Sequence, residues 1–178
     1  MGSLWYALSV KTRFEKLVNA HLQGRGYETF LPTYLERRKW SDRTKSLVIP
    51  LFPGYIFCRF DINARVPILM TPGVNFIVGA GRTPVAVDES EIAGLRQAVG
   101  SGKPILPCQY KKIGETVEIE QGPLRGIRGT IVRIENVDRL VLSISLLMRS
   151  VAVEIDLSSV KPINYPTVAA CEAMARSA

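Results

Sequence analysis

Hydrophobic positions in the first part of the chain follow strand and helix periods in turn. Residues 5–10 and 27–31 are rich in aromatic and β-branched side chains, which is typical of strands. Between them, apolar residues from Phe14 to Leu22 recur at helical spacing on one face. Thr12 and Glu15 stand three residues apart, as in a capping box, and predict the start of this helix.

A third strand is predicted over residues 55–60, directly after the pair Pro53-Gly54. Alternation gives one face Tyr55, Phe57 and Arg59, and the other face Ile56, Cys58 and Phe60. The second set is the better core face. The first set mixes two aromatic rings with a charge, which is typical of a face that a helix covers or a partner binds. On this stretch alone, packing in the core is the favoured interpretation.

The pattern changes near residue 100. Asp88 and Glu91 form a second capping box, which predicts a helix that ends at Gly100. Glycine and two prolines follow, as in a linker, and the rest of the chain shows short alternating segments typical of a small barrel. The sequence therefore predicts an α+β protein with a mixed domain over residues 1–100, a linker over 101–110, a small β-barrel over 111–163 and a flexible tail over 164–178.

Composition narrows the possible functions. The chain has 178 residues and a formal net charge of +7, which favours a polyanionic partner or an acidic protein surface. The alternative is a soluble protein that happens to be basic. Its three cysteines lie far apart and it has a single histidine, so we expect no metal site, no cofactor and no enzymatic activity.

Targeting signals are also missing from the sequence. No apolar run reaches the ~18 residues of a membrane span. The first residues lack the charged and apolar regions of a signal peptide. We therefore expect a cytoplasmic protein that does not contact a membrane.

Basic residues gather between residues 36 and 45, where the apolar pattern lapses. They surround one aromatic side chain and comprise Arg37, Arg38, Lys39, Trp40, Arg43 and Lys45. Such a loop is suited to phosphate contacts and to stacking on bases or sugars. A solvated hairpin tip explains the same composition equally well, and the sequence leaves both interpretations open.

Short motifs along the chain resemble a known family. In the first part they are Trp5-Tyr6-Ala7, Phe30-Leu31-Pro32, Leu51-Phe52-Pro53-Gly54-Tyr55-Ile56-Phe57 and Thr71-Pro72-Gly73-Val74. In the second part, residues 114–119 and 122–129 resemble a KOW motif. Their order and spacing resemble the NusG family of transcription elongation factors, whose specialised members include RfaH. The resemblance covers roughly residues 4 to 163.

The resemblance implies a fold and a partner. The first domain would be a four-stranded antiparallel sheet flanked by helices, and the second an SH3-like barrel. An apolar patch on the first domain would bind the clamp helices of the largest catalytic subunit of RNA polymerase, keep the clamp closed and reduce pausing. By resemblance, the patch would contain Tyr6, Phe52, Pro53, Tyr55, Pro72, Gly73 and Val74.

Further contacts follow from the same resemblance. The barrel would recruit ribosomal protein S10 or termination factor Rho through Leu124, Ile127 and Arg128, although general NusG proteins often carry an aromatic residue at the position of Ile127. Upstream or non-template DNA would meet the basic loop together with Lys11, Arg13 and Lys16. We therefore interpret the chain as a monomeric, specialised bacterial paralogue that aids elongation or antitermination. The alternative is an RNA-binding or ribosome-associated KOW module.

Overall fold

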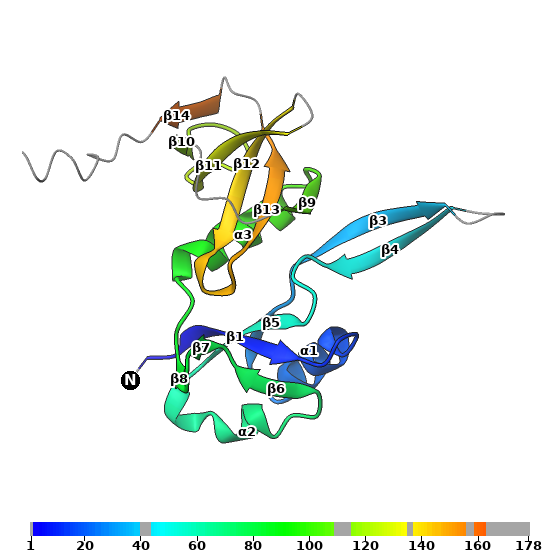
Figure 1. Cartoon of the computed structure of the whole chain (residues 1–178), viewed down its shortest axis with the longest axis vertical. Coiled ribbons are helices and arrows are strands. Elements are labelled where there is room, and N and C mark those ends of the chain that lie inside the picture. Colours follow the sequence, from blue (N-terminus) through cyan, green and yellow to red (C-terminus); the bar gives the residue numbers. More distant parts are fainter. Residues whose placement is uncertain (1, 40–43, 109–114, 135–136, 156–158, 163–178) are drawn as a thin grey trace, which may run out of the picture.

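The N-terminal half of the chain folds around a four-stranded antiparallel sheet (Figure 1). The computed structural model describes residues 2–39, 44–108, 115–134, 137–155 and 159–162. In spatial order, the strands are β2 (Glu28–Phe30), β5 (Tyr55–Phe60), β1 (Leu4–Val10) and β6 (Val74–Ile77). The predicted strand over residues 55–60 is therefore a central strand of this sheet, which leaves each of its two faces to be covered.

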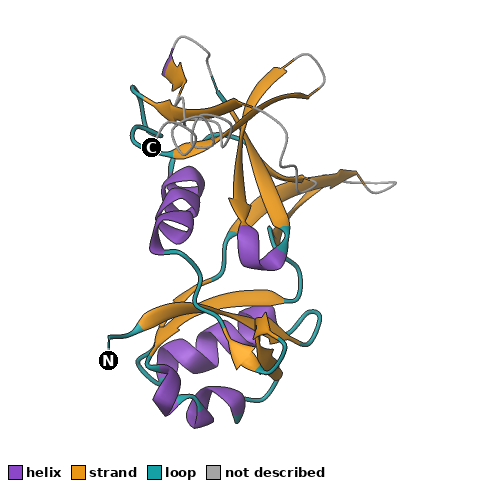
Figure 2. Ribbon diagram, turned by 60° about the vertical axis from the view of Figure 1, so that its left-hand side comes forward, coloured by secondary structure: helices purple, strands orange, loops and turns teal. Residues whose placement is uncertain are grey.

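Helices cover one face, called here the rear face. They are α1 (Glu15–Gly24), the short 3₁₀ turn η1 (Ile62–Ala64) and α2 (Val66–Leu69), and they lie together on one side of the sheet (Figure 2). Val18, Leu22 and Ile68 from these helices pack against the rear-facing residues Leu8, Ile56, Cys58 and Phe60. Ile56, Cys58 and Phe60 thus form the core face that alternation predicts.

A hairpin projects away from the first sheet (Figure 1). Its strands are β3 (Thr33–Lys39) and β4 (Thr44–Pro50), and they pair in register from Thr33 opposite Pro50 to Lys39 opposite Thr44. A smaller two-stranded ribbon of β7 (Gly79–Ala80) and β8 (Thr83–Pro84) follows β6. Among the predicted basic residues, Arg37, Arg38 and Lys39 therefore lie at the end of β3 and Lys45 near the start of β4, in the far part of a protruding two-stranded arm.

The C-terminal half is a second antiparallel sheet, called here the β domain. Its strands, in spatial order, are β14 (Val160–Pro162), β10 (Glu115–Ile119), β11 (Arg128–Ile134), β12 (Val137–Ile144), β13 (Arg149–Glu154) and β9 (Ile105–Cys108), with the 3₁₀ turn η2 (Ser145–Leu147) between β12 and β13. The α+β fold predicted from the sequence is confirmed. Strand β9 pairs with β13, so residues expected to belong to the linker form part of this sheet.

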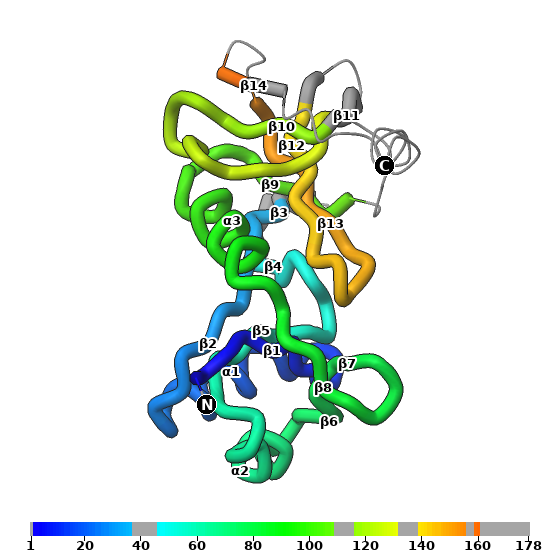
Figure 3. The backbone as a smooth tube through the Cα atoms, turned by 90° about the vertical axis from the view of Figure 1, so that its left-hand side faces the viewer, coloured from blue at the N-terminus to red at the C-terminus, as the bar shows by residue number. Residues whose placement is uncertain are grey.

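Helix α3 (Glu89–Gly100) stands between the two sheets (Figure 3). The predicted capping box forms only in part, because the Glu91 carboxylate accepts from the backbone N–H of Ser145 and not from that of Asp88. Asp88 is the N-cap, as the sequence predicts, and it accepts hydrogen bonds from the backbone N–H and the hydroxyl of Ser90 at 2.7 and 2.6 Å. These bonds lower the pKa of the Asp88 carboxyl below its ordinary value. Among the described residues, no helix is long and apolar enough to cross a membrane.

The capping box predicted for α1 does not form. The helix begins at Glu15 after Phe14, whose side chain makes no capping hydrogen bond. The Glu15 carboxylate instead accepts a hydrogen bond from the backbone N–H of Gly54 at 2.8 Å and is almost fully buried. The prediction was wrong because a tertiary contact with the Pro53-Gly54 turn takes the side chain that a local cap would use.

A substitution at Gly73 tests the packing of the Pro72-Gly73 turn against Phe14 and α1. Gly73 has φ +96°, and a Cβ atom there would lie 2.9 Å from Cγ2 of Val18 and 3.0 Å from Cδ1 of Phe14. We expect Gly73→Ala to lower the free energy of unfolding by about 2 kcal/mol or more, because it combines a left-handed backbone with overpacking.

Urea unfolding checks this value, and Gly24→Ala is the matched control. Gly24 ends α1 with open space around it and no positive φ, so its replacement should leave stability unchanged or slightly higher. Equal stability of the two variants would contradict the turn geometry.

Candidate functional site

The second face of the N-terminal sheet, called here the front face, carries a patch of aromatic residues. Cross-strand pairing sets Phe30, Phe57 and Ala7 side by side across β2, β5 and β1. The next row joins Tyr55, Ser9 and Phe76 across β5, β1 and β6. Residues directly opposite one another in a sheet share a face, so these rows form one continuous surface.

Two Pro-Gly turns fix the end of this surface. Backbone N–H groups of Val10 and Lys11, at the end of β1, donate to the carbonyls of Gly54 and Gly73 at 2.9 and 2.8 Å. Both glycines have positive φ, as the third position of a type II turn requires after proline. The two turns therefore close on the same end of one strand and hold the residues beside them in place.

The first turn presents Phe52 to the aromatic patch. Its ring packs edge-on against Phe57, with centroids 5.8 Å apart, and Phe30 lies 6.2 Å from Phe57 on the other side. Edge-to-face pairs of this kind add to the energy of apolar burial. Phe52 is 1% exposed and Phe57 is fully buried, so in this arrangement of the domains the patch is a packed core.

Two residues predicted for the polymerase patch lie on the rear face instead. Tyr6 pairs with Cys58 in the sheet, stacks on Phe60 at 4.8 Å and belongs to the rear core. Val74 pairs with Val10 and packs in the same core. Tyr6 is excluded from the front face because only alternate residues of β1 share a face, and Val74 is excluded because it lies opposite the rear-facing Val10. Pro53 and Pro72 are exposed in their turns.

Ser9 and Phe76 belong to the front face, although the predicted patch contained neither. Between Ser9 and Val10 the pairing of β1 with β6 shifts by one residue, so Asn75 has no partner in β1. This irregularity puts Val74 and Phe76 on opposite faces, whereas strict alternation would place them together. No feature of the local sequence indicates this shift in pairing, so the facing of Phe76 could not be predicted. Ser9 could have been assigned correctly, because strict alternation along β1 places it on the other face from Tyr6.

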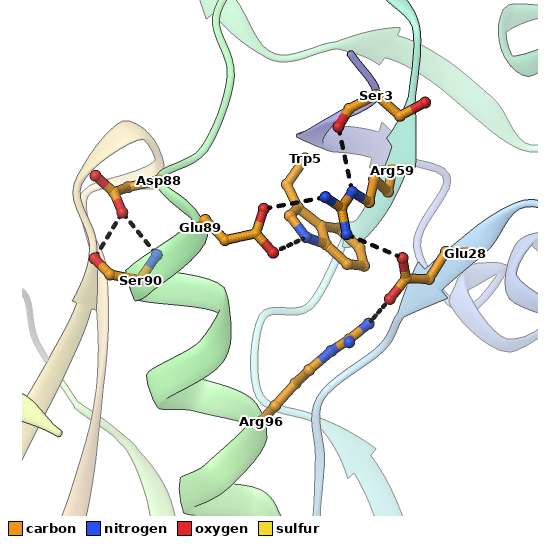
Figure 4. Close-up of polar contacts among 8 residues, drawn as sticks. All are labelled: Ser3, Trp5, Glu28, Arg59, Asp88, Glu89, Ser90 and Arg96. Atoms are coloured by element: carbon orange, nitrogen blue, oxygen red, sulfur yellow. Dashed lines mark hydrogen bonds and ion pairs between the residues drawn. The ribbon is translucent and has the colours of Figure 1, made fainter. Parts of the chain in front are cut away.

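Polar groups tie α3 to one edge of the front face (Figure 4). Trp5 donates from its indole Nε1 to Glu89 at 3.2 Å, and the Arg96 guanidinium lies over the Trp5 ring at 4.7 Å. Arg96 also pairs with Glu28 at 2.9 Å, and Arg59 lies between Glu28 and Glu89 at 3.6 and 3.7 Å. The four charges are partly exposed, so each pair is weak, but together they fix the angle of the helix.

Another side of α3 contacts the β domain. The Gln97 amide donates to the backbone carbonyls of Pro123 and Arg125 at 3.0 and 2.9 Å. The Glu91 carboxylate accepts from the backbone N–H of Ser145 at 3.2 Å. Gly94 faces Ile127, and a Cβ atom at Gly94 would lie 3.6 Å from Cγ2 of Ile127. The helix thus joins the two domains through both of its sides.

The β domain covers the aromatic patch from above. One cluster of buried residues runs from Trp5, Phe52 and Phe57 through α3 into the strands of the β domain. The turn between β12 and β13 points toward the front face (Figures 1 and 2), and the Arg149 guanidinium lies 5.3 Å from the centre of the Tyr55 ring. The structure is therefore a closed arrangement in which the domains share a core.

The residues predicted to bind a partner of the β domain lie at the same junction. Leu124 and Ile127 are almost fully buried, while Arg128 is exposed and pairs with Glu118 at 2.8 Å. A groove of about 400 Å³ runs beside them between α3 and the β domain, lined in part by Ser90, Gln97, Arg128 and Ser143. The closed arrangement thus buries Phe52 of the first predicted protein-binding surface together with Leu124 and Ile127 of the second.

A family comparison decides the identity. A family model described as "Transcription termination factor nusG" matches residues 3–96, which are 94 of the 178 residues. The chain belongs to the NusG family. The match spans the N-terminal sheet, the hairpin and most of α3, so it includes the whole front face.

Curated relatives of the NusG family cover nearly the whole chain. Both relatives described here carry the name "Transcription termination/antitermination protein NusG". The protein from Helicobacter pylori strain J99 is 28% identical over 173 residues, which cover 89% of this chain and 98% of the relative. The protein from Thermus thermophilus is also 28% identical, over 183 residues that cover 90% and 98%.

A solved structure shares the fold. The structure described as "Domain interaction in Thermotoga maritima NusG" has a TM-score of 0.54 and 22% identity, and it covers 91% of this chain and 98% of that one. At this level of identity, the similarity shows the fold alone. The two-domain α+β architecture is thus one that a NusG protein adopts.

The predicted nucleic-acid residues lie on two separate elements. Lys11, Arg13 and Lys16 are exposed at the junction of β1 and α1, where Arg13 has φ 71°. Backbone strain of this kind in a residue other than glycine often marks a functional position. In the hairpin, Arg37, Arg38 and Lys39 end β3 and Lys45 lies in β4, whereas Trp40 and Arg43 lie outside the described residues.

The thiol of Cys58 lies in the rear core. Burial raises the pKa of the Cys58 thiol to about 12, and the nearby Glu28 adds to the shift. A thiol with this pKa stays protonated at neutral pH and is a poor nucleophile. Within the described ranges, no group of three or more His, Cys, Asp or Glu residues could hold a metal ion.

Gly94 offers a test of the closed arrangement. A Cβ atom there makes an ordinary contact with Ile127, but the longer side chain of leucine would overlap it. Leucine also favours helix more than glycine does. We expect Gly94→Leu to keep α3 helical, push the β domain away and raise the radius of gyration in small-angle X-ray scattering.

Gly94→Ala is the matched control, because its Cβ atom fits the space and the domains should stay together. The closed arrangement would be contradicted if the leucine variant scattered like the native chain while circular dichroism showed it fully folded.

Proposed function

We propose that this NusG-family chain binds RNA polymerase through its front face and suppresses pausing or termination during transcription. The observation that supports this most directly is the continuous row of aromatic residues held by the Pro53-Gly54 turn. Phe52, Tyr55 and Phe57 form a compact apolar surface of the kind that carries most of the affinity in protein interfaces. The resemblance to NusG proteins supplies the partner, the clamp helices of the largest polymerase subunit.

Access to this surface requires the domains to separate. Phe52 and Phe57 are buried in the closed form, so a partner that uses them binds only molecules whose β domain has moved away. The apparent affinity is then reduced by the fraction of open molecules. The polar contacts made by Glu91 and Gln97 are few and lie near solvent, which suits an arrangement that opens.

The partner-binding surface proposed for the β domain also becomes accessible only when the domains separate. Leu124 and Ile127 are the residues proposed to recruit a further factor such as ribosomal protein S10 or Rho. Both are buried in the closed form, and Ile127 faces Gly94 of α3. A factor bound there would compete with α3 and favour the open molecule. Binding to polymerase and binding to that factor would then reinforce one another, because each selects the same state.

The hairpin suits a contact with nucleic acid. It carries Arg37, Arg38, Lys39 and Lys45 away from the domain body, and the whole chain has a net charge of +7. We propose that this arm meets upstream or non-template DNA, and that its sequence distinguishes a specialised paralogue from a general NusG factor.

Tyr55→Ala tests the polymerase surface. Tyr55 is only partly buried in the closed form, so its truncation should leave the fold intact. We expect a loss of about 2 kcal/mol or more in binding to purified polymerase, which corresponds to roughly thirtyfold in Kd. Gly94→Leu, measured in the same assay, should bind more tightly than the native chain.

Met70→Ala is the control for Tyr55→Ala, because Met70 is an exposed apolar residue that follows α2 on the rear side. If Tyr55→Ala bound like this control, the proposed surface would be wrong. If the native chain ignored polymerase and bound RNA or ribosomes, the KOW-module alternative would replace the proposal.

Neutralising two arginines of the hairpin tests whether this arm contacts nucleic acid. Each phosphate contact contributes about −0.7 to −0.9 to the slope of log K against log salt concentration. We expect the pair Arg37→Gln and Arg38→Gln to reduce the slope for binding an elongation complex by about 1 to 2. The control replaces the exposed Arg65 and Arg82 with glutamine, which gives the same net charge as the hairpin variant and should not change the slope. Equal slopes in both double variants would favour a solvated hairpin without a nucleic-acid contact.

A further inference from the structure

Phe76 is an exposed aromatic residue on the front face, and it is not among the residues proposed above to bind polymerase. It lies in β6, which pairs only with β1 among the described strands and therefore forms an edge of the sheet. The residue is 56% exposed. Edge strands are often protected by charged residues or proline, whereas Asn75 and Phe76 are the two exposed residues of this strand.

The register places Phe76 in line with the aromatic patch. It lies opposite Ser9, and Ser9 lies opposite Tyr55, so the three side chains form one row across β6, β1 and β5. Ser9 is small and leaves a shallow step between the two rings. Val78, two residues further along the chain, packs into the shared core beside Ala7. Phe76 therefore continues the same face rather than starting a separate surface.

Coverage by the β domain stops short of Phe76. Polar and cation–π contacts to the front face come from α3, near Trp5, and from Arg149, over Tyr55, and the apolar cluster shared with the β domain includes Phe52 and Phe57 but not Phe76. Phe52 and Phe57 lie beneath this cover, but Phe76 stays open to solvent in the same closed molecule. The front face thus has a covered part and an open end.

We propose that Phe76 is an additional anchor for the polymerase segment that binds the front face. A single exposed aromatic residue is ordinary on a protein surface. This one is distinguished by its continuity with Tyr55 and by the shift in strand pairing that turns it toward the front. The inference rests on the proposed function and names a residue that both the closed and the open molecule can offer.

Two variants test Phe76 by affinity. Phe76→Ala should weaken binding to purified polymerase about tenfold, since anchors of this kind cost more than 1 kcal/mol when truncated. Phe76→Trp, which keeps an aromatic surface, should stay within about threefold of the native chain. The loss should also persist when Phe76→Ala is combined with Gly94→Leu, because Phe76 acts in both states of the domains.

Asn75→Ala is the matched control. Asn75 is also exposed in the same strand but has no partner in β1, so its truncation should not change affinity. Thermal unfolding of each variant separates lost binding from lost stability. If Phe76→Ala bound like Asn75→Ala while Tyr55→Ala lost affinity, the inference would fail and the proposed function would stand. If the native chain did not bind polymerase, both would fail.

A photo-crosslinker gives a second measurement that does not rely on truncation. With p-benzoylphenylalanine in place of Phe76, irradiation of the complex should capture the largest polymerase subunit. The same group in place of Met70, which is exposed on the rear side, should not. Capture from both positions or from Met70 alone would overturn the assignment.

Discussion

The contact between Gly54 and Glu15 supports the rest of the N-terminal domain. One peptide unit of the Pro53-Gly54 turn donates to a buried carboxylate, and the same residue accepts from the end of β1. A buried carboxylate needs such a partner, and its position in the first turn of α1 adds the favourable field of the helix dipole. The turn, the central strand and the first helix therefore adopt their geometry together. This geometry sets the positions of Phe52 and Tyr55, which flank the turn.

Helix α3 couples this geometry to the second domain. One side of the helix makes a network of partly exposed charges with the sheet, while the other makes a small number of backbone-directed bonds with the β domain. Most of the attraction between the domains comes from the shared apolar cluster, which is not directional. The polar contacts chiefly select one orientation, so small changes along α3 shift the balance between closed and open molecules.

The sequence predicted the main helices and strands, but it did not predict features that depend on contacts between residues far apart in the chain. Alternation in residues 55–60 predicted the rear core correctly because a central strand has a regular pleat. The resemblance grouped Tyr6 with residues of the opposite face, although alternation along β1 separates it from them. Phe76 was absent from the predicted patch, because its facing depends on the unpaired Asn75, which only the pairing of β6 with β1 reveals. The role of Glu15 was hidden for a similar reason, since its partner is thirty-nine positions away.

The hairpin has a consequence for how the chain's charges act. From Thr33 to Lys39 the arm extends about 20 Å at ~3.3 Å per residue, and its strands are seven residues long. Electrostatic interactions in physiological salt decay over about 8 Å. Charges at the far end of the arm are therefore screened from those of the domain body. Its basic residues can be exchanged without altering the fold or the balance between the domains, so the arm can evolve as an independent module of recognition.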